Sequence, residues 1–182
     1  MTQLLDDVML IGKAEVGKLD CHPIALDVVQ FCRDLVDELH PSSISNHHIT
    51  FVSQTNILYA YLDEKLLRHI LVNLLSNAIK YSPNGGTVNF HLGYQNGEIS
   101  FQIQDQGIGI PTIELERLFS SFYRASNVGN ISGTGLGLAI IKKAVDLQQG
   151  KIAVESEVGV GTRFVVSLPL QQEKIYEQDF SH

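Results

Sequence analysis

Alternation between apolar and polar residues in three short segments constrains the fold of this chain more than any other feature. The apolar residues occupy every second position in each segment: Val88, Phe90 and Leu92; Ile99, Phe101 and Ile103; and Phe164, Val166 and Leu168. Successive side chains of a β-strand point to opposite faces, so each of these strands buries one face only. The sequence therefore predicts a mostly antiparallel sheet with one face that other elements must cover.

Turn and helix signals complete this prediction. Asn96-Gly97 separates the first two alternating segments, and this dipeptide is a strong signal for a tight hairpin. Further strands are predicted at residues 48–54, 56–62, 151–157 and 162–170. Helical periodicity predicts helices at residues 22–40, 63–82 and 136–149. We expect an α+β fold, a two-layer α/β sandwich whose mixed, mostly antiparallel sheet carries its helices on one face.

Length and composition limit the classes of protein to which the chain can belong. A chain of 182 residues can bury one sizeable core, so we expect one main domain. Its formal net charge of -7 and the lack of a basic run argue against nucleic-acid binding. No segment approaches the length of a membrane span, so we expect no membrane contact by this segment. The spacing of Cys21 and Cys32 favours free thiols in a reducing compartment, which predicts a cytoplasmic location.

The helix predicted over residues 63–82 carries polar residues that a purely structural helix does not need. Asn costs about 0.5 kcal/mol against Ala in a helix, yet Asn73 and Asn77 lie four residues apart on one stripe. Lys80 and Tyr81 follow near the end of the helix. An amide oxygen suits Mg²⁺, a lysine can meet a phosphate, and a tyrosine ring can lie against a base. The alternative is a pair of core amides that hydrogen-bond to the backbone.

A second candidate binding residue follows the strand around Phe101. The inward parity of that strand continues onto Asp105, and a carboxylate at an inward position is costly unless a donor faces it. The amino group of a purine is a suitable donor, and Gly107 and Gly109 allow close approach of a flat group to the backbone. The alternative is an aspartate that caps the turn before Gly107.

A third candidate site is the glycine cluster at the start of the last predicted helix, formed by Gly133, Gly135 and Gly137. Backbone amides and the helix dipole make such a helix start an anion site. Flexible helix-entry glycines are the alternative. A cluster of this kind is weak evidence for function by itself.

Other nucleotide-binding motifs are excluded by single residues. A dinucleotide-binding fingerprint needs glycine where Thr112 or Leu138 stands. No Gly-Lys pair is followed by Ser or Thr, as a P-loop requires. The sequence also lacks the HRD and DFG signatures of eukaryotic protein kinases.

Four segments, taken in order, are more specific than any one of them. They read NLLSNAIKYS from Asn73, DQGIGIP from Asp105, LFSSFYR from Leu118 and GTGLGLAI from Gly133. In this order and spacing they resemble the motifs of the catalytic ATP-binding domain of sensor histidine kinases, a member of the GHKL ATPase/kinase superfamily. The resemblance covers about residues 24–170.

The resemblance implies that ATP and Mg²⁺ are the bound cofactors. It implies a binding site made of Asn73, Asn77, Lys80, Tyr81, Asp105, Gly107, Gly109, Ile110, Phe122, Arg124, Gly133, Thr134, Gly135, Leu136 and Gly137. Asn77 would coordinate the metal, while Asn73, Lys80 and Arg124 would act on the phosphates as the catalytic residues.

The resemblance also assigns the base and the lid. Asp105 would accept a hydrogen bond from the adenine amino group, and Tyr81 would pack on the ring. The glycines at 133, 135 and 137 would wrap the triphosphate, where Thr134 could donate its hydroxyl. Phe119 and Phe122 would anchor the lid, with ordinary core packing as the alternative.

One part of the histidine-kinase pattern is missing. The phosphorylated histidine of that family precedes an acidic residue in an H-E-x-R-T-P context, and none of the seven histidines lies in such a context. Residues 1–20 resemble the end of the second dimerisation helix of the family. We expect residues 1–20 to be a remnant of that helix, residues 21–170 to be the catalytic domain, and residues 171–182 to be a loose tail.

The resemblance thus implies a histidine protein kinase that transfers the γ-phosphate of ATP to a histidine on its own dimerisation domain, outside this chain. A response regulator would be an indirect partner. We expect this segment to be monomeric by itself, because most of the dimerisation helices are missing. The alternative is a nucleotide-sensing GHKL module without histidine kinase activity, or a serine kinase of the anti-sigma type. The N-terminal helix favours the histidine kinase, because those relatives lack a dimerisation helix.

Overall fold

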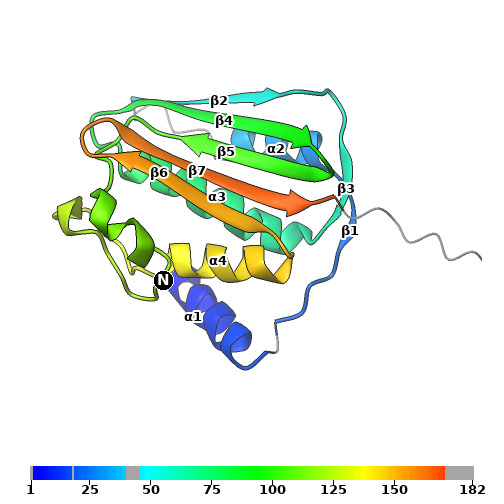
Figure 1. The fold of residues 1–182 in the computed structure, drawn as a ribbon, viewed down its shortest axis with the longest axis horizontal. Coiled ribbons are helices and arrows are strands. Elements are labelled where there is room, and N and C mark those ends of the chain that lie inside the picture. Colours follow the sequence, from blue (N-terminus) through cyan, green and yellow to red (C-terminus); the bar gives the residue numbers. More distant parts are fainter. Residues whose placement is uncertain (1, 18, 40–45, 171–182) are drawn as a thin grey trace, which may run out of the picture.

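The sheet predicted from the alternating segments is the centre of the computed structural model, which describes residues 2–17, 19–39 and 46–170 (Figure 1). Its five strands lie in the order β2-β4-β5-β7-β6. They are β2 (His47–Ser53), β4 (Gly86–Gln95), β5 (Glu98–Gln104), β6 (Lys151–Glu157) and β7 (Gly161–Pro169). Strand β2 runs parallel to β4, and the other neighbours are antiparallel. The prediction of a mixed, mostly antiparallel sheet is confirmed.

The turn between β4 and β5 sets the register that brings the apolar residues together. Asn96 and Gly97 have φ angles of 53° and 78°, the positive values that a two-residue hairpin turn requires. In the resulting register Leu92 pairs with Phe101, and Phe101 pairs with Val166. These three side chains are at most 1% exposed, so the parity read from the sequence identifies the buried face.

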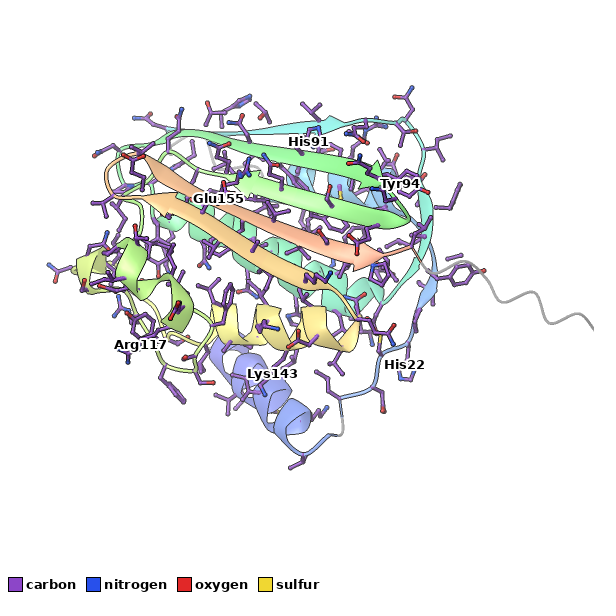
Figure 2. All side chains as sticks on the ribbon, in the orientation of Figure 1. His22, His91, Tyr94, Arg117, Lys143 and Glu155 are labelled. Carbon is purple, nitrogen blue, oxygen red and sulfur yellow. The ribbon has the colours of Figure 1, made fainter. Side chains whose placement is uncertain are left out.

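Helices α2 (Val28–Glu38), α3 (Glu64–Lys80) and α4 (Gly137–Leu147) cover that face, and their apolar residues join those of the strands in one core. Figure 1 shows α2 and α3 behind the strands. The opposite face of the sheet carries polar side chains such as His91 and Glu155 (Figure 2). The prediction of a two-layer sandwich with helices on one face is therefore confirmed.

The prediction of one helix over residues 22–40 is wrong at its start. Ile24–Asp27 form a short strand, β1, which pairs antiparallel with β3 (Tyr59–Leu62) in a separate two-stranded ribbon. Asp27 is extended, and its carboxylate accepts hydrogen bonds from the amides of Val29 and Gln30. This N-cap starts α2 at Val28, because the side chain satisfies amides that have no partner within the helix.

The first helix, α1 (Thr2–Glu15), packs against α4 at one end of the sandwich (Figure 1). Leu5, Val8 and Met9 lie on one stripe of α1 and are 51–65% exposed. Over the described ranges, no helix combines the length and apolar character needed to cross a membrane. The predicted tail, residues 171–182, lies outside the described residues.

Candidate functional site

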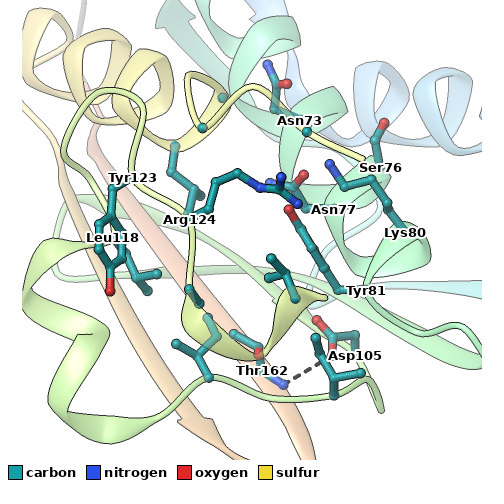
Figure 3. Close-up of a pocket in the computed structure, with 18 of the residues that line it drawn as sticks. Asn73, Ser76, Asn77, Lys80, Tyr81, Asp105, Leu118, Tyr123, Arg124 and Thr162 are labelled. Atoms are coloured by element: carbon teal, nitrogen blue, oxygen red, sulfur yellow. Dashed lines mark hydrogen bonds between the residues drawn. The ribbon is translucent and has the colours of Figure 1, made fainter. Parts of the chain in front are cut away.

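A cavity of about 370 Å³ lies between α3, the segment after β5, the start of α4 and the loop that leads from this segment to α4 (Figure 3). We call residues 118–136 of this loop the lid. The cavity is lined by Asn73, Ser76, Asn77, Lys80, Tyr81, Asp105, Ile108, Gly109, Ile110, Leu118, Tyr123, Arg124, Ala125, Val128, Ser132, Gly133, Thr134, Gly135, Gly137, Leu138, Thr162 and Phe164. This volume is within the range of about 300–1,000 Å³ that is usual for small-molecule sites.

Helix α3 supplies one wall because its two faces differ in polarity. Its leucines, such as Leu71, Leu74 and Leu75, are at most 1% exposed in the core. Asn73 and Asn77 lie on the stripe that faces the cavity. The amide nitrogen of Asn73 donates to the carbonyl of His69 over 2.9 Å, which leaves its oxygen available. In the described part of the chain, no hydrogen bond occupies the Asn77 side chain, so Asn77 is not the backbone-bonded core amide of the alternative interpretation.

The last turn of α3 places a cation and an aromatic ring side by side. The ammonium of Lys80 lies 4.7 Å from the centre of the Tyr81 ring, a cation–π contact. A Cβ atom at Gly133 would lie 3.0 Å from the Lys80 ammonium, 3.5 Å from the Tyr81 hydroxyl and 3.9 Å from Nε of Arg124. Gly133 thus lets the lid approach these three side chains, and both cations of the cavity wall meet there.

The opposite end of the cavity is closed by Asp105, the residue after β5. It is 7% exposed, as the inward parity of the strand predicts. Its Oδ1 atom accepts hydrogen bonds from the amide of Gly107 over 2.8 Å and from the amide of Thr162 over 3.1 Å. Figure 3 shows the hydrogen bond from Thr162. No donor of the described residues is bonded to Oδ2. Burial raises the pKa of Asp105 above its ordinary value, and the two amide hydrogen bonds lower it in part. The carboxylate is therefore poorly compensated and suited to an incoming donor.

Gly107 and Gly109 are required by the close packing of the protein backbone. A Cβ atom at Gly107 would collide with the carbonyl oxygen of Tyr81, and one at Gly109 would collide with that of Glu157. Both positions have to be glycine because neighbouring chain segments approach there. The backbone of neighbouring segments thus accounts for both glycines, and Gly109 also lines the cavity. The close approach of a flat group to these two positions stays a prediction.

The lid brings Arg124 to the cavity. Figure 3 shows the Arg124 side chain extending across the cavity toward Asn77. Its guanidinium donates to the carbonyl of Ile131 in the same lid. At the end of the lid, the hydroxyl of Thr134 accepts a hydrogen bond from the amide of Leu136 over 3.2 Å, which fixes the chain just before α4.

Most of the predicted binding residues meet at this cavity. The structure brings together Asn73, Asn77, Lys80, Tyr81, Asp105, Gly109, Ile110, Arg124, Gly133, Thr134, Gly135 and Gly137. Gly107, Phe122 and Leu136 do not line the wall. Leu136 is 1% exposed in the core, and Phe122 is 72% exposed at the surface of the lid. Phe119 packs against the core, which supports the core-packing alternative for this ring.

Several lining residues are absent from the sequence prediction. Thr162 and Phe164 come from β7, which reaches the cavity only because it pairs with β5. Thr162 and Asp105 also exchange backbone contacts, since the amide of Asp105 donates to the carbonyl of Thr162 over 2.9 Å. Ser76 and Tyr123 stand next to predicted residues, so the helical period and the lid motif are signals that could have found them.

The arrangement of charge suits a ligand with two different ends. A buried acceptor, Asp105, lies at one end, and Lys80 and Arg124 supply positive charge at the other. Asn77 lies on α3 at the cationic end, near Arg124, and its amide oxygen is a neutral, hard ligand (Figure 3). A purine nucleotide with phosphates presents a hydrogen-bond donor and several negative charges in the same order, so the residues fit such a ligand.

Known proteins with similar sequences carry the same domain. Residues 62–172 match the family model described as histidine kinase-, DNA gyrase B-, and HSP90-like ATPase. The circadian input-output histidine kinase CikA of Thermosynechococcus vestitus is 35% identical over 175 residues, 93% of this chain and 24% of that protein. The sensor histidine kinase WalK of Bacillus subtilis is 31% identical over 180 residues, 96% of this chain and 29% of that protein. The chain thus spans less than a third of either relative.

Solved structures agree with the sequence comparison. The mycobacterial sensor histidine kinase MprB is 30% identical, with a TM-score of 0.69 over 80% of this chain and 97% of that chain. Full-length ShkA in complex with AMPPNP has a TM-score of 0.81 over 93% of this chain and 36% of that chain, and its 24% identity supports the fold alone. The resemblance read from the four sequence segments is confirmed. The chain therefore belongs to the histidine kinase-, DNA gyrase B- and HSP90-like ATPase family, as an ATP-binding domain of the sensor histidine kinase type.

Proposed function

We propose that this domain binds ATP together with Mg²⁺ and presents the γ-phosphate to a histidine on a separate dimerisation domain. The observation that carries this proposal is the cavity in which a buried acceptor, two cations and an unbonded amide from separate sequence segments converge. Phosphoryl transfer depends mainly on positioning and charge neutralisation, which such a site can supply. The nucleophilic nitrogen would come from the other domain and displace ADP from the γ-phosphorus.

Asp105 and Tyr81 are the residues that we assign to the adenine. Because Oδ1 of Asp105 is already bonded to two amides, the adenine amino group would donate to Oδ2. The Tyr81 ring borders the same cavity and offers an apolar face to the base. We assign Ile108, Ile110 and Thr162 to the walls of this end.

The phosphates are assigned to the other end of the cavity. Lys80 would meet them as a point charge, and Arg124 would bind them through its planar group. Asn73 and the amides near Gly135 and Gly137 would complete the phosphate site. Mg²⁺ would be held by the amide oxygen of Asn77 together with phosphate oxygens and water, and it would neutralise charge that develops on the phosphates. Over the described ranges no three His, Cys, Asp or Glu side chains gather as metal ligands. A Mg²⁺ ion held by one protein oxygen, phosphates and water does not need such a cluster.

The neighbouring parts follow from the same proposal. Residues 1–20 would belong to a dimerisation helix, and the exposed stripe of Leu5, Val8 and Met9 on α1 supports this. Residues 21–170 would form the catalytic domain, which we expect to be monomeric by itself. A response regulator would receive the phosphoryl group from the phosphohistidine, and we place this chemistry in the cytoplasm. The serine kinase and the nucleotide sensor are not favoured, because CikA and WalK are histidine kinases.

The test is the Asn77→Ala variant of this chain. We expect it to keep its thermal unfolding midpoint and to lose the part of the ATP affinity that depends on Mg²⁺, as measured by calorimetry with and without EDTA. Asn56→Ala is the matched control, because Asn56 is exposed and does not line the cavity. Unchanged Mg²⁺-dependent affinity in Asn77→Ala would remove the metal role. Absence of any ATP binding by the folded wild-type chain would overturn the proposed function.

A further inference from the structure

Glu114 binds the lid with both of its carboxylate oxygens. It lies in a short 3₁₀-helix, η1 (Thr112–Arg117), outside the cavity wall. Its Oε2 atom accepts hydrogen bonds from the Tyr123 hydroxyl over 2.7 Å and from the Ser126 amide over 2.9 Å. Its Oε1 atom accepts a hydrogen bond from the Ser126 hydroxyl. One carboxylate therefore holds two lid residues through three donors.

These two lid residues enclose Arg124. Tyr123 precedes Arg124 directly, Ser126 follows two positions later, and Ala125 between them is 7% exposed. Glu114 thus connects η1 to the residues on both sides of Arg124, through the side chain of Tyr123 and through the backbone amide and hydroxyl of Ser126. The Arg124 side chain itself is exposed and reaches into the cavity (Figure 3). Glu114 does not line the cavity, so its effect on a ligand has to pass through the lid.

The chemistry of these contacts favours an ionised carboxylate. All three partners of Glu114 are donors, and only the ionised form accepts from all of them without presenting a donor of its own. The hydrogen bonds from Ser126 and Tyr123 lower the pKa of Glu114, so it stays charged at neutral pH. The guanidinium of Arg117, which also belongs to η1, lies 4.7 Å from the centre of the Tyr123 ring (Figure 2). This cation–π contact is a further link between η1 and Tyr123.

We propose that Glu114 is a positioning residue, which holds Arg124 at the phosphate end of the cavity by binding Tyr123 and Ser126. This inference rests on the proposed function, in which Arg124 binds the terminal phosphates. Without Glu114 the Arg124 backbone would sample more positions, and the bound state would have to restrict them again. The cost falls on ligands that use Arg124, so ATP is affected more than ADP.

We call the hydrogen bonds of Glu114 with Tyr123 and Ser126 the tether. The first experiment measures, without any nucleotide, how firmly the tether holds the lid. Trypsin cleaves after Arg124, and mass spectrometry gives the rate at this bond. We expect faster cleavage after Arg124 in Glu114→Ala than in the matched control Glu116→Ala. Glu116 is suitable as a control because it is exposed and makes no ion pair or hydrogen bond with described residues. Glu114→Gln, which keeps one acceptor oxygen, should cleave at an intermediate rate. Equal rates in all variants with intact folds would overturn the tether.

The second experiment measures whether the tether acts through Arg124. We expect Glu114→Ala to lower ATP affinity about three- to tenfold and ADP affinity by a smaller factor, with an unchanged unfolding midpoint. In an Arg124→Ala background the Glu114→Ala change should have little further effect on ATP affinity, because the group that it positions is gone. A loss of the same size in both backgrounds would overturn the proposal.

The same measurements separate this inference from the proposed function. If wild type binds ATP and Arg124→Ala weakens it while Glu114→Ala does not, this inference fails and the proposed function stands. If wild type binds no ATP, the proposed function fails and the phosphate role of Glu114 fails with it.

Discussion

The amide of Phe122 donates a hydrogen bond to the carbonyl of Gly135 over 2.9 Å, which joins the two ends of the lid. We call this junction of Phe122 and Gly135 the neck of the lid. Phe122 has a φ of 63° and Gly135 a φ of 73°, so both residues lie in the left-handed region. A Cβ atom at Gly135 would lie 2.7 Å from the carbonyl carbon of Phe122. The neck closes only because position 135 is glycine, and it sets where Arg124 enters the cavity.

The variant Gly135→Ala should open this neck and weaken ATP binding about tenfold or more, since it combines left-handed strain of about 1–3 kcal/mol with a backbone clash. Gly129→Ala is the control, because Gly129 has a φ of 52° but a Cβ atom there would meet no other atom within 4 Å. It carries strain without the clash and should reduce ATP affinity less. Calorimetry on both variants makes the comparison, and equal losses would show that the neck contact is unimportant.

The raised pKa of Asp105 leads to opposite effects of Asp105→Asn on stability and binding. Because burial raises the folded pKa, the group stabilises the fold at low pH, and this contribution is lost as pH rises through the folded pKa. Asn can still accept from Gly107 and Thr162 but has no charge to desolvate. We therefore expect Asp105→Asn to match or exceed the wild-type unfolding midpoint at pH 7.

The same substitution replaces the free acceptor Oδ2 by an NH₂ donor. A hydrogen bond to a charged group contributes about 1.5–3 kcal/mol, so ATP affinity should fall about 10- to 150-fold. In wild type, ATP affinity should also decrease as pH falls toward the raised pKa, and in Asp105→Asn this dependence should be absent. Calorimetry at several pH values checks both points. Wild-type ATP affinity in Asp105→Asn would contradict the adenine assignment.

Local sequence patterns were sufficient for the sheet and for one wall of the site. The period of two in β4, β5 and β7 and the Asn96-Gly97 turn act over a few residues, so they identify the buried face and the register directly. The stripe of Asn73 and Asn77 follows from helical geometry in the same way. Where side-chain direction depends on the local period alone, the sequence predicts it.

The features that sequence reasoning missed depend on contacts between distant segments. The helical period does not reveal that Asp27 caps α2, and β1 forms because β3 is available to pair with it. The requirement for Gly109 comes from the carbonyl of Glu157 in β6, and Thr162 reaches the cavity through the pairing of β5 with β7. The sequence does not distinguish Glu114 from an ordinary surface acid, because its partners Tyr123 and Ser126 belong to the lid and are 9 and 12 residues away.

Two N-cap aspartates provide a test of how α3 is held in the fold. The Asp63 carboxylate is 6% exposed and accepts from the amides of Leu66 at 3.0 Å and His22 at 2.8 Å, so it caps α3 and also binds the segment before β1. Asp27 caps only α2. Each substitution removes the acceptor of two amides, but water reaches the exposed hydrogen bond of Gln30 at Asp27, whereas the hydrogen bond of Leu66 at Asp63 is buried. We therefore expect Asp63→Ala to lose about 2–3 kcal/mol in the free energy of unfolding, against about 1 kcal/mol for Asp27→Ala. Urea denaturation compares the two, and equal losses would contradict the double role of Asp63.

The charge of Lys80 should matter for phosphates and little for the base. Its ammonium meets the lid near Gly133 and Arg124, at the end of the cavity away from Asp105. Lys80→Ala should lower ATP affinity about tenfold and adenosine affinity only slightly, while Lys80→Arg retains part of the ATP affinity because the positive charge is kept. Lys65→Ala is the control, since Lys65 is exposed on α3 and does not line the cavity. Calorimetry with ATP and adenosine separates the two ends of the ligand. An equal loss for both ligands would mean that Lys80 supports Tyr81 through the cation–π contact and does not bind phosphate.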